Sequence, residues 1–256
     1  MSFLFSLAIF LSANSFAGVY DKKKIWPIGK KIISVCIYNP QTADRDQDAV
    51  IPNPFLINLT KDVISNAYKT ETTIIEFNGF DDCSNLSSPD VVLVFTNKDF
   101  GSGYVNRFAD FEKNSTIKVF IGLGNKLDTF TKEETQEIET TILHEFGHVA
   151  GLQHEHQYFR REALKDPNCH LKLKTGDTGV QWIKGTAKFA RSAGKNGALG
   201  LMGRIAPYYV AFKRDKSTIG SYDPYSIMNY CYINNNPTSK LSDGDVETLR
   251  FMYRNH

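Results

Sequence analysis

The sequence predicts an α+β fold, in which a mixed sheet with packed helices is followed by an irregular part that ends in a helix. Three observations support this prediction. Short runs rich in β-branched residues occur with a helix pattern in the order strand, helix, strand, strand. A long helix pattern then occupies the middle of the chain. Beyond it, regular patterning is poor until a last helix pattern at residues 241–253.

The elements of the first part have clear local signals. The expected strands are residues 30–38, 72–77, 91–96 and 116–123. Asn53 and Pro54 are a cap and a first-turn residue, and they predict a helix from there to about residue 69. The Gly-Ser-Gly sequence at residues 101–103 indicates a loop before the last of these strands.

The long middle helix is predicted from its two ends. Thr131 and Glu134 form a capping-box pattern at its start. Gly151 follows the last periodic position, where a left-handed residue can end a helix. We expect an upper lobe at about residues 25–151 and a lower lobe at about residues 152–256.

Composition limits the class of protein. The chain has 256 residues, enough for one sizeable core or for two lobes around a cleft. Hydrophobic residues make up 41% and aromatic residues 12%, as in a globular protein and unlike a disordered one. The formal net charge of +2 does not favour nucleic-acid binding, so we expect no nucleic-acid partner.

Residues 1–17 resemble a signal peptide. No charged side chain precedes Asp21, residues 3–11 are almost entirely apolar, and small residues precede a cut at Gly18. A membrane anchor is the alternative, but a span needs about 20 apolar residues and this run is shorter. We therefore expect a secreted or periplasmic protein whose mature domain covers residues 18–256.

Four cysteines are present: Cys36, Cys83, Cys169 and Cys231. In an exported chain an even number indicates disulfides, here two bonds with three possible pairings. Of these pairings we favour Cys36 with Cys83 and Cys169 with Cys231.

Residues 181–216 carry eight basic side chains and one acidic side chain. We interpret this segment as a solvated insertion in the lower lobe, because charge runs usually face water. Binding of an anionic surface is the alternative.

Residues 144–154 read His-Glu-Phe-Gly-His-Val-Ala-Gly-Leu-Gln-His and predict a site for one zinc ion. His144 and His148 are four apart on the expected helix, so both imidazoles project from one face. Gly151 lets the chain leave the helix and bring back His154 as a third ligand. Three neutral imidazoles suit Zn²⁺, and an open fourth position is typical of a catalytic site.

Glu145 directly follows the first ligand, where it can take a proton from a zinc-bound water rather than bind the metal. This pattern predicts peptide-bond hydrolysis, with Glu145 as general base and then as proton donor to the departing amine. The remaining histidines, His156, His170 and His256, are interpreted as surface or neighbouring groups, because the three motif histidines complete the expected ligand set.

A second segment, residues 221–230, reads Ser-Tyr-Asp-Pro-Tyr-Ser-Ile-Met-Asn-Tyr. The extended zinc motif with this methionine turn resembles the metzincin clan of zinc endopeptidases. Within the clan the chain most resembles the astacin family, over roughly residues 25–256. The segments that carry this resemblance are His154-Glu155-His156 with Arg160, residues 226–230, Leu241-Ser242-x-x-Asp245, and Tyr104-Val105-x-Arg107.

The resemblance implies roles for individual residues. Met228 would form an apolar floor beneath the zinc ligands. Tyr230 would be a switchable further zinc ligand and would stabilise the oxyanion. An extended peptide substrate would pair with residues 116–123 as the edge strand. Glu155 matches a residue that lies near the N-terminus of the mature enzymes, and Asn229 stands where the family has His.

Other interpretations remain open beside a secreted, monomeric zinc endopeptidase. A matrixin-like or snapalysin-like metzincin would share every catalytic residue except Tyr230. A zinc-containing binding protein on the same scaffold would not cut, although such a protein has no need of Glu145. A chain that chiefly binds envelope or DNA would depend on the basic segment 181–216.

Overall fold

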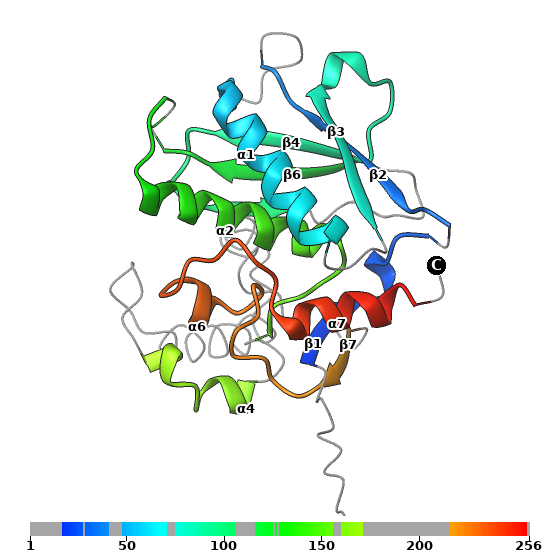
Figure 1. Ribbon diagram of the computed structural model, residues 1–256, viewed down its shortest axis with the longest axis vertical. Coiled ribbons are helices and arrows are strands. Elements are labelled where there is room, and N and C mark those ends of the chain that lie inside the picture. Colours follow the sequence, from blue (N-terminus) through cyan, green and yellow to red (C-terminus); the bar gives the residue numbers. More distant parts are fainter. Residues whose placement is uncertain are drawn as a thin grey trace, which may run out of the picture.

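The structure is a computed structural model that describes residues 17–27, 29–40, 48–70, 75–105, 116–124, 126, 128–155, 160–170 and 216–254. A mixed sheet and two long helices occupy one half, and short helices with a small two-stranded sheet occupy the other (Figure 1). Of the expected leader at residues 1–17, all but Ala17 lies outside the described residues, and so does the basic segment up to residue 215.

The main sheet has five strands in the order β3-β2-β4-β6-β5. Their bounds are β2 Ile32–Ile37, β3 Glu76–Asp82, β4 Val91–Thr96, β5 Gly103–Val105 and β6 Ile117–Gly122. The first four strands in this order pair in parallel, and β5 is antiparallel to β6. The predicted mixed sheet is therefore confirmed.

Two expectations about strands need correction. Of the strand expected at residues 72–77, residues 72–74 lie outside the described residues, and β3 begins at Glu76 and continues to Asp82. Its second half is polar and contains Gly79, with φ of 109°, so local propensity does not indicate a strand there. The strand forms there because it pairs with β2, with a register shift between Val35 and Cys36.

The second correction concerns the edge of the sheet. Residues 116–123 were expected to form the edge strand, but β6 is paired with β4 on one side and with β5 on the other. Among the described residues, β5 is the outermost strand at this end. A three-residue strand that begins with glycine was interpreted from sequence as part of a loop.

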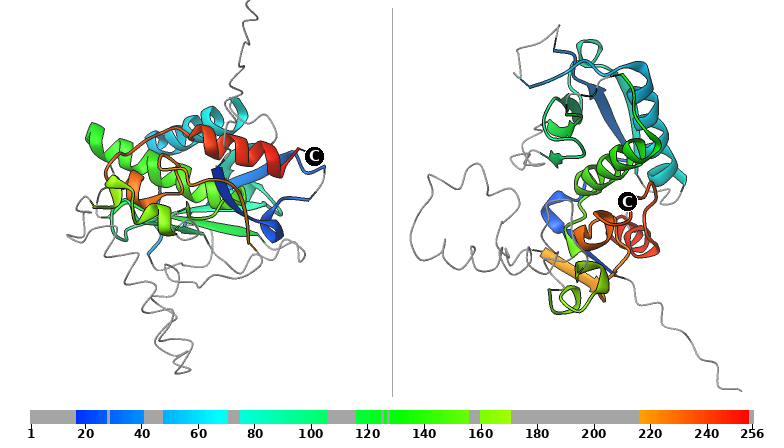
Figure 2. Two further views of the ribbon diagram at one scale, coloured as in Figure 1. Left: turned by 90° about the horizontal axis from the view of Figure 1, so that it is seen from below. Right: turned by 90° about the vertical axis from the view of Figure 1, so that its left-hand side faces the viewer.

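Two helices cover one face of the sheet (Figures 1 and 2). Helix α1, Pro54–Ile64, begins as predicted after Asn53, whose side chain accepts a hydrogen bond from the main-chain N–H of Leu56. It ends in a π-helical turn at Ser65–Thr70. Helix α2, Lys132–Val149, has the predicted Thr131–Glu134 capping box, and packs against α1, β5 and β6.

Aromatic contacts fix α2 on the sheet. The rings of Tyr68 and Phe77 meet edge to face at 5.2 Å, and those of Phe77 and Phe146 at 5.1 Å. The hydroxyl of Tyr68 donates to the carbonyl of Leu143 at 3.2 Å. All these side chains are buried, so the helix that carries the zinc motif is anchored in the largest hydrophobic core.

The remaining elements lie on the other side of α2 (Figure 1). They are β1 Ala17–Asp21, α4 Arg160–Ala163, the 3-10 helix η5 Pro167–His170, β7 Lys216–Gly220, α6 Tyr230–Ile233 and α7 Asp243–Met252. The predicted last helix is confirmed, with Ser242 as its cap. The antiparallel pair of β1 and β7 was not predicted, because its strands are far apart in the sequence. The division into two lobes stays a prediction.

Strand β1 and the end of α7 brace the chain that leaves α2. Gly151 has φ of 96°, as predicted for the residue that ends the helix. Its carbonyl accepts a hydrogen bond from the N–H of Asp21 at 3.1 Å, and Gln153 donates its N–H to Val19 at 2.8 Å. The hydroxyl of Tyr253 donates to the carbonyl of Ala150 at 3.0 Å. The path toward His154 is therefore fixed by hydrogen bonds from distant segments.

The favoured cysteine pairing is confirmed. Cys36 is bonded to Cys83, and Cys169 to Cys231. The first bond joins β2 to the turn after β3, and the second joins η5 to α6. No helix within the described ranges is long and apolar enough to span a bilayer.

Candidate metal centre

Three imidazoles converge beneath α2. His144 and His148 project from one face of the helix, and His154 approaches from the segment after Gly151. Nε2 of His154 lies 3.2 Å from Nε2 of His144 and 3.0 Å from Nε2 of His148. The sequence prediction that these three side chains meet is confirmed.

The other ring nitrogens fix the orientation of two imidazoles. Nδ1 of His144 lies 2.8 Å from the carbonyl oxygen of Ile227, and Nδ1 of His148 lies 2.9 Å from that of Leu152. A carbonyl can only accept, so Nδ1 of each ring carries the proton and Nε2 presents its lone pair. Burial lowers the pKa of His144 to about 4, which keeps this imidazole neutral. Both features are what a metal requires of a histidine ligand.

The donor set fits zinc. Nitrogen atoms bound at about 2.0–2.1 Å to a tetrahedral zinc ion lie roughly 3.3 Å apart. The observed separations of 3.0 and 3.2 Å are close to this value. All three ligand atoms lie within 4.8 Å of one another. The three histidines are thus placed to bind one metal ion, and His144, His148 and His154 are the residues that would hold it.

Met228 lies directly under the helix between the two helical histidines. It is buried, and a β-carbon at Gly147 would lie 2.7 Å from its sulfur atom. Gly147 therefore lets the methionine turn approach the helix. In the sequence, Gly147 is identified only as a motif residue between the two helical histidines. That position is the one sequence feature that could have indicated close packing against the helix.

Asp245 of α7 holds the same turn and was not predicted to do so. Its carboxylate accepts hydrogen bonds from the hydroxyl of Ser226 at 2.6 Å and from the N–H of Ile227 at 2.9 Å. Burial, followed by the charge of Asp223, raises the pKa of Asp245 to about 6. The carboxylate also completes the capping box with Ser242. In the sequence, Asp245 belongs to the Leu241-Ser242-x-x-Asp245 segment of the family resemblance.

Tyr230 lies against the histidine cluster. Its ring centroid is 4.9 Å from that of His144, with the planes 18° apart, and 4.7 Å from that of His154. The ring stands at the first position of α6, directly after the cap residue Asn229.

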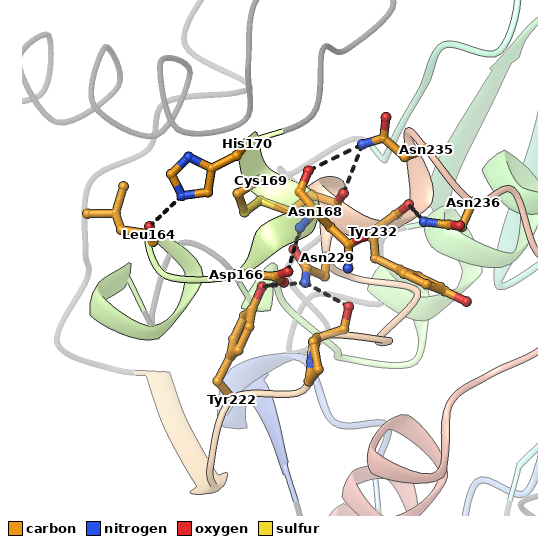
Figure 3. The surroundings of a disulfide bond; sticks show 12 residues. Leu164, Asp166, Asn168, Cys169, His170, Tyr222, Asn229, Tyr232, Asn235 and Asn236 are labelled. Atoms are coloured by element: carbon orange, nitrogen blue, oxygen red, sulfur yellow. Dashed lines mark hydrogen bonds between the residues drawn. A yellow bond between two sulfur atoms is a disulfide. The ribbon is translucent and has the colours of Figure 1, made fainter.

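The two residues that flank Tyr230, Asn229 and Cys231, are each connected to the segment 166–169, and Figure 3 shows the contacts of Asn229 and the disulfide of Cys169. On one side, the side-chain amide of Asn229 donates to the hydroxyl of Tyr222 at 2.5 Å, and that hydroxyl donates to Asp166 at 2.7 Å. On the other side, Cys231 is bonded to Cys169. Both connections join the segment 166–169 to the segment 229–231, so the backbone of Tyr230 is held from both directions.

Glu145 lies outside the group of converging ligand atoms, as expected for a base rather than a ligand. It is buried, and it belongs to the neighbouring stripe of α2 with Thr141 and Glu137. This stripe faces the turn at residues 101–103, because a β-carbon at Gly103 would lie 2.7 Å from the Glu145 side chain.

Glu155 and His170 have other surroundings. Glu155 is buried, and burial with the charges of Asp245 and Asp223 raises its pKa to about 9. Its carboxylate accepts a main-chain hydrogen bond from Val19, one residue after the predicted cut at Gly18.

His170 is exposed, with Nε2 3.1 Å from the carbonyl oxygen of Leu164. His156 and His256 lie outside the described residues.

Comparison with known proteins supports the fold. No protein-family model and no curated protein matches the sequence. One solved structure of myroilysin is 19% identical, with 92% of this chain and 98% of that chain covered and a TM-score of 0.52. A second myroilysin structure is 20% identical, with 90% and 86% covered and a TM-score of 0.47. At 19% identity the first likeness shows a shared fold alone.

Proposed function

We propose that this chain is a secreted zinc-dependent endopeptidase. The observation that supports this most is the convergence of three histidine Nε2 atoms beside a buried glutamate on the same helix. Three protein ligands leave a coordination position open, which is the arrangement of catalytic rather than structural zinc sites. When bound there, zinc would act as a Lewis acid that lowers the pKa of water to about 7 and polarises a carbonyl.

Glu145 supplies the general base in this proposal. It takes a proton from the attacking water and delivers that proton to the departing amine, so one carboxylate serves both halves of the reaction. Its place on the stripe next to the ligands puts it on the side of the helix that faces β5.

Tyr230 supplies a donor for the oxyanion and, in the resting site, a weak further contact to the metal. The stacking of its ring on His144 and its tilted contact with the ring of His154 support this role. It also favours an astacin-like enzyme over matrixin-like or snapalysin-like branches, which share the other catalytic residues but lack this tyrosine. In this proposal the contacts of Asn229 and Cys231 hold the backbone on either side of Tyr230, and the side chain of Tyr230 is the part that moves.

The substrate is proposed to be an extended peptide that adds to β5 instead of residues 116–123. The N–H of Gly122 donates to the carbonyl of Ser102 at 2.7 Å, so Ser102 and Gly122 form a hydrogen-bonded pair. Because such pairs alternate along an antiparallel ladder, the main-chain groups of Gly103 and Val105 point to the outer edge. A peptide strand would exchange hydrogen bonds with these two residues.

Export is proposed because the chain contains two disulfide bonds. Two disulfides persist in oxidising compartments and are rare in the cytosol, so their presence favours a secreted or periplasmic enzyme. Cleavage near Gly18, a monomeric state and binding of an anionic surface by residues 181–216 stay predictions.

The experiment is digestion of a peptide library by the purified full chain, with Glu145→Gln as the matched variant. We expect internal peptide bonds to be cut by the wild type, with a rate about 100- to 10,000-fold lower for Glu145→Gln at equal zinc content. Equal rates for the two proteins would reject the proposed mechanism. Zinc binding without any cleavage by the wild type would favour a non-catalytic binding protein.

A further inference from the structure

The turn before β5 packs on one stripe of α2. Glu137, Thr141 and Glu145 follow one another at intervals of four residues and so line one side of the helix. A β-carbon at Gly101 would lie 2.3 Å from Oε1 of Glu137, and one at Gly103 would lie 2.7 Å from both Cγ and Oε1 of Glu145. The backbone of the turn therefore touches the proposed base directly.

This turn is held in place from two sides. The hydroxyl of Thr141 donates to the carbonyl of Gly101 at 3.0 Å, which ties the turn to the helix. The N–H of Gly101 donates to Gly122 at 3.0 Å, and the N–H of Gly122 donates to Ser102 at 2.7 Å, which ties it to β6. A side chain added to the turn could not be accommodated by a simple shift of the backbone.

The two glycines are required for different reasons. Gly101 has φ of 70°, a left-handed conformation that other residues rarely adopt. Gly103 has no positive φ, so alanine could take its backbone conformation. What excludes alanine is space, because its β-carbon would also lie 2.8 Å from Cγ2 of Thr141, and real β-carbons essentially never lie within 3.0 Å of another atom.

We propose that Gly103 is a positioning residue for Glu145. Its bare α-carbon lets the main chain of β5 rest against the carboxylate, so the base and the edge offered to the peptide are in contact. The same residue presents its outer N–H and carbonyl to the substrate strand. Gly103 thus sets which peptide bond lies over the base, and this role rests on the proposed function of Glu145.

The first test measures stability and needs no activity. Gly103→Ala and Glu145→Ala are made singly and together in the full chain, and thermal unfolding midpoints are compared at equal zinc content. Overpacking against Glu145 should lower the midpoint by several degrees in Gly103→Ala. When Gly103→Ala is added to Glu145→Ala, the midpoint should fall by less than half as much as when it is added to the wild type, because the Glu145 side chain that the new methyl group would displace is absent. An equal loss in both backgrounds would overturn the inference.

If Gly103→Ala alone does not fold, the folding of the double variant Gly103→Ala/Glu145→Ala decides the test. Combination with Glu145→Ala should then restore folded protein, since the larger of the two clashes is removed. Failure of the double variant to fold would show that the contact with Glu145 is not the reason for glycine.

The second test is kinetic. Displacement of the base by about 1 Å should lower kcat of Gly103→Ala by roughly 100-fold while zinc content stays at the wild-type level. Ser102→Ala changes the same turn without adding an atom and should retain wild-type kcat. A full kcat in Gly103→Ala, or an equal loss in Ser102→Ala, would contradict the positioning role. If the wild type cuts no peptide, the proposed function fails, and the stability comparison still decides the role of Gly103.

Discussion

Asp245 of α7 is joined to His144 of α2 through a single main-chain residue. The carboxylate of Asp245 accepts a hydrogen bond from the N–H of Ile227 at 2.9 Å, and the carbonyl oxygen of Ile227 lies 2.8 Å from Nδ1 of His144. A residue near the end of the chain therefore sets the orientation of the first proposed zinc ligand. Partners of this kind hold the ligand ring and tune its affinity for metal.

Asp245→Asn should weaken zinc binding by about 10-fold and lower the free energy of unfolding by about 2–4 kcal/mol. The carboxylate accepts from two hydroxyls and two main-chain N–H groups, and an amide would direct its own N–H toward some of these donors. Competition with a chromogenic chelator measures the affinity. Asp243→Asn, an exposed change in the same helical turn, is the control and should have neither effect.

Asp245 also predicts a pH dependence. Its folded pKa of about 6 lies above the ordinary value of 3.8, so the folded state binds a proton more readily than the unfolded state. This contribution to stability is therefore gained as pH falls from about 6 to about 4 and is lost as pH rises. Denaturant unfolding of metal-free protein should show the wild type gaining up to about 3 kcal/mol relative to Asp245→Asn across this window. A constant difference between the two proteins would contradict the assignment.

Tyr230→Phe removes one hydroxyl and keeps the ring that stacks on His144 and contacts His154. Loss of an oxyanion donor should lower kcat about 100-fold with little change in KM, zinc content or thermal stability. Steady-state kinetics on one defined peptide gives both constants. A stable, zinc-loaded variant with full activity would show that Tyr230 is only a packed aromatic residue, and the astacin-like assignment would be withdrawn.

Removal of the Cys169–Cys231 bond should reduce turnover, whereas removal of Cys36–Cys83 should not. The two bonds span 62 and 47 residues, so their effects on the unfolded chain are nearly equal, at about 4 kcal/mol each. Only the first flanks Tyr230, and its loss frees one of the two connections around that residue (Figure 3). The two double variants, Cys36→Ser/Cys83→Ser and Cys169→Ser/Cys231→Ser, should therefore lose similar stability. Only Cys169→Ser/Cys231→Ser should also show a kcat about 10-fold lower. Equal kcat losses would contradict a specific role for this bond.

The residues that sequence analysis identified lie close together in the chain. His144, His148 and the capping box of α2 follow from helix geometry, and Gly151 from the conformation that ends a helix. Such features depend on neighbours within a few positions, so one sequence is enough to predict them.

The features that sequence analysis missed depend on distant contacts. Strand β5 has only three residues and exists because β6 pairs with it, so residues 116–123 were wrongly expected at the edge. The pairing of β1 with β7, the support of Ile227 by Asp245 and the space left by Gly103 each join segments far apart in the chain. No local pattern distinguishes such residues from ordinary turn or cap residues.

The central claim is that one zinc ion, held by His144, His148 and His154, is required for peptide-bond hydrolysis. The most direct measurement is the rate of peptide cleavage by the chelator-stripped full chain as zinc is added back and bound zinc is counted. We expect no cleavage without metal, and a rate that rises in proportion to bound zinc and stops rising at one equivalent per chain. Full cleavage by the metal-free chain, or one bound equivalent without cleavage, would contradict it.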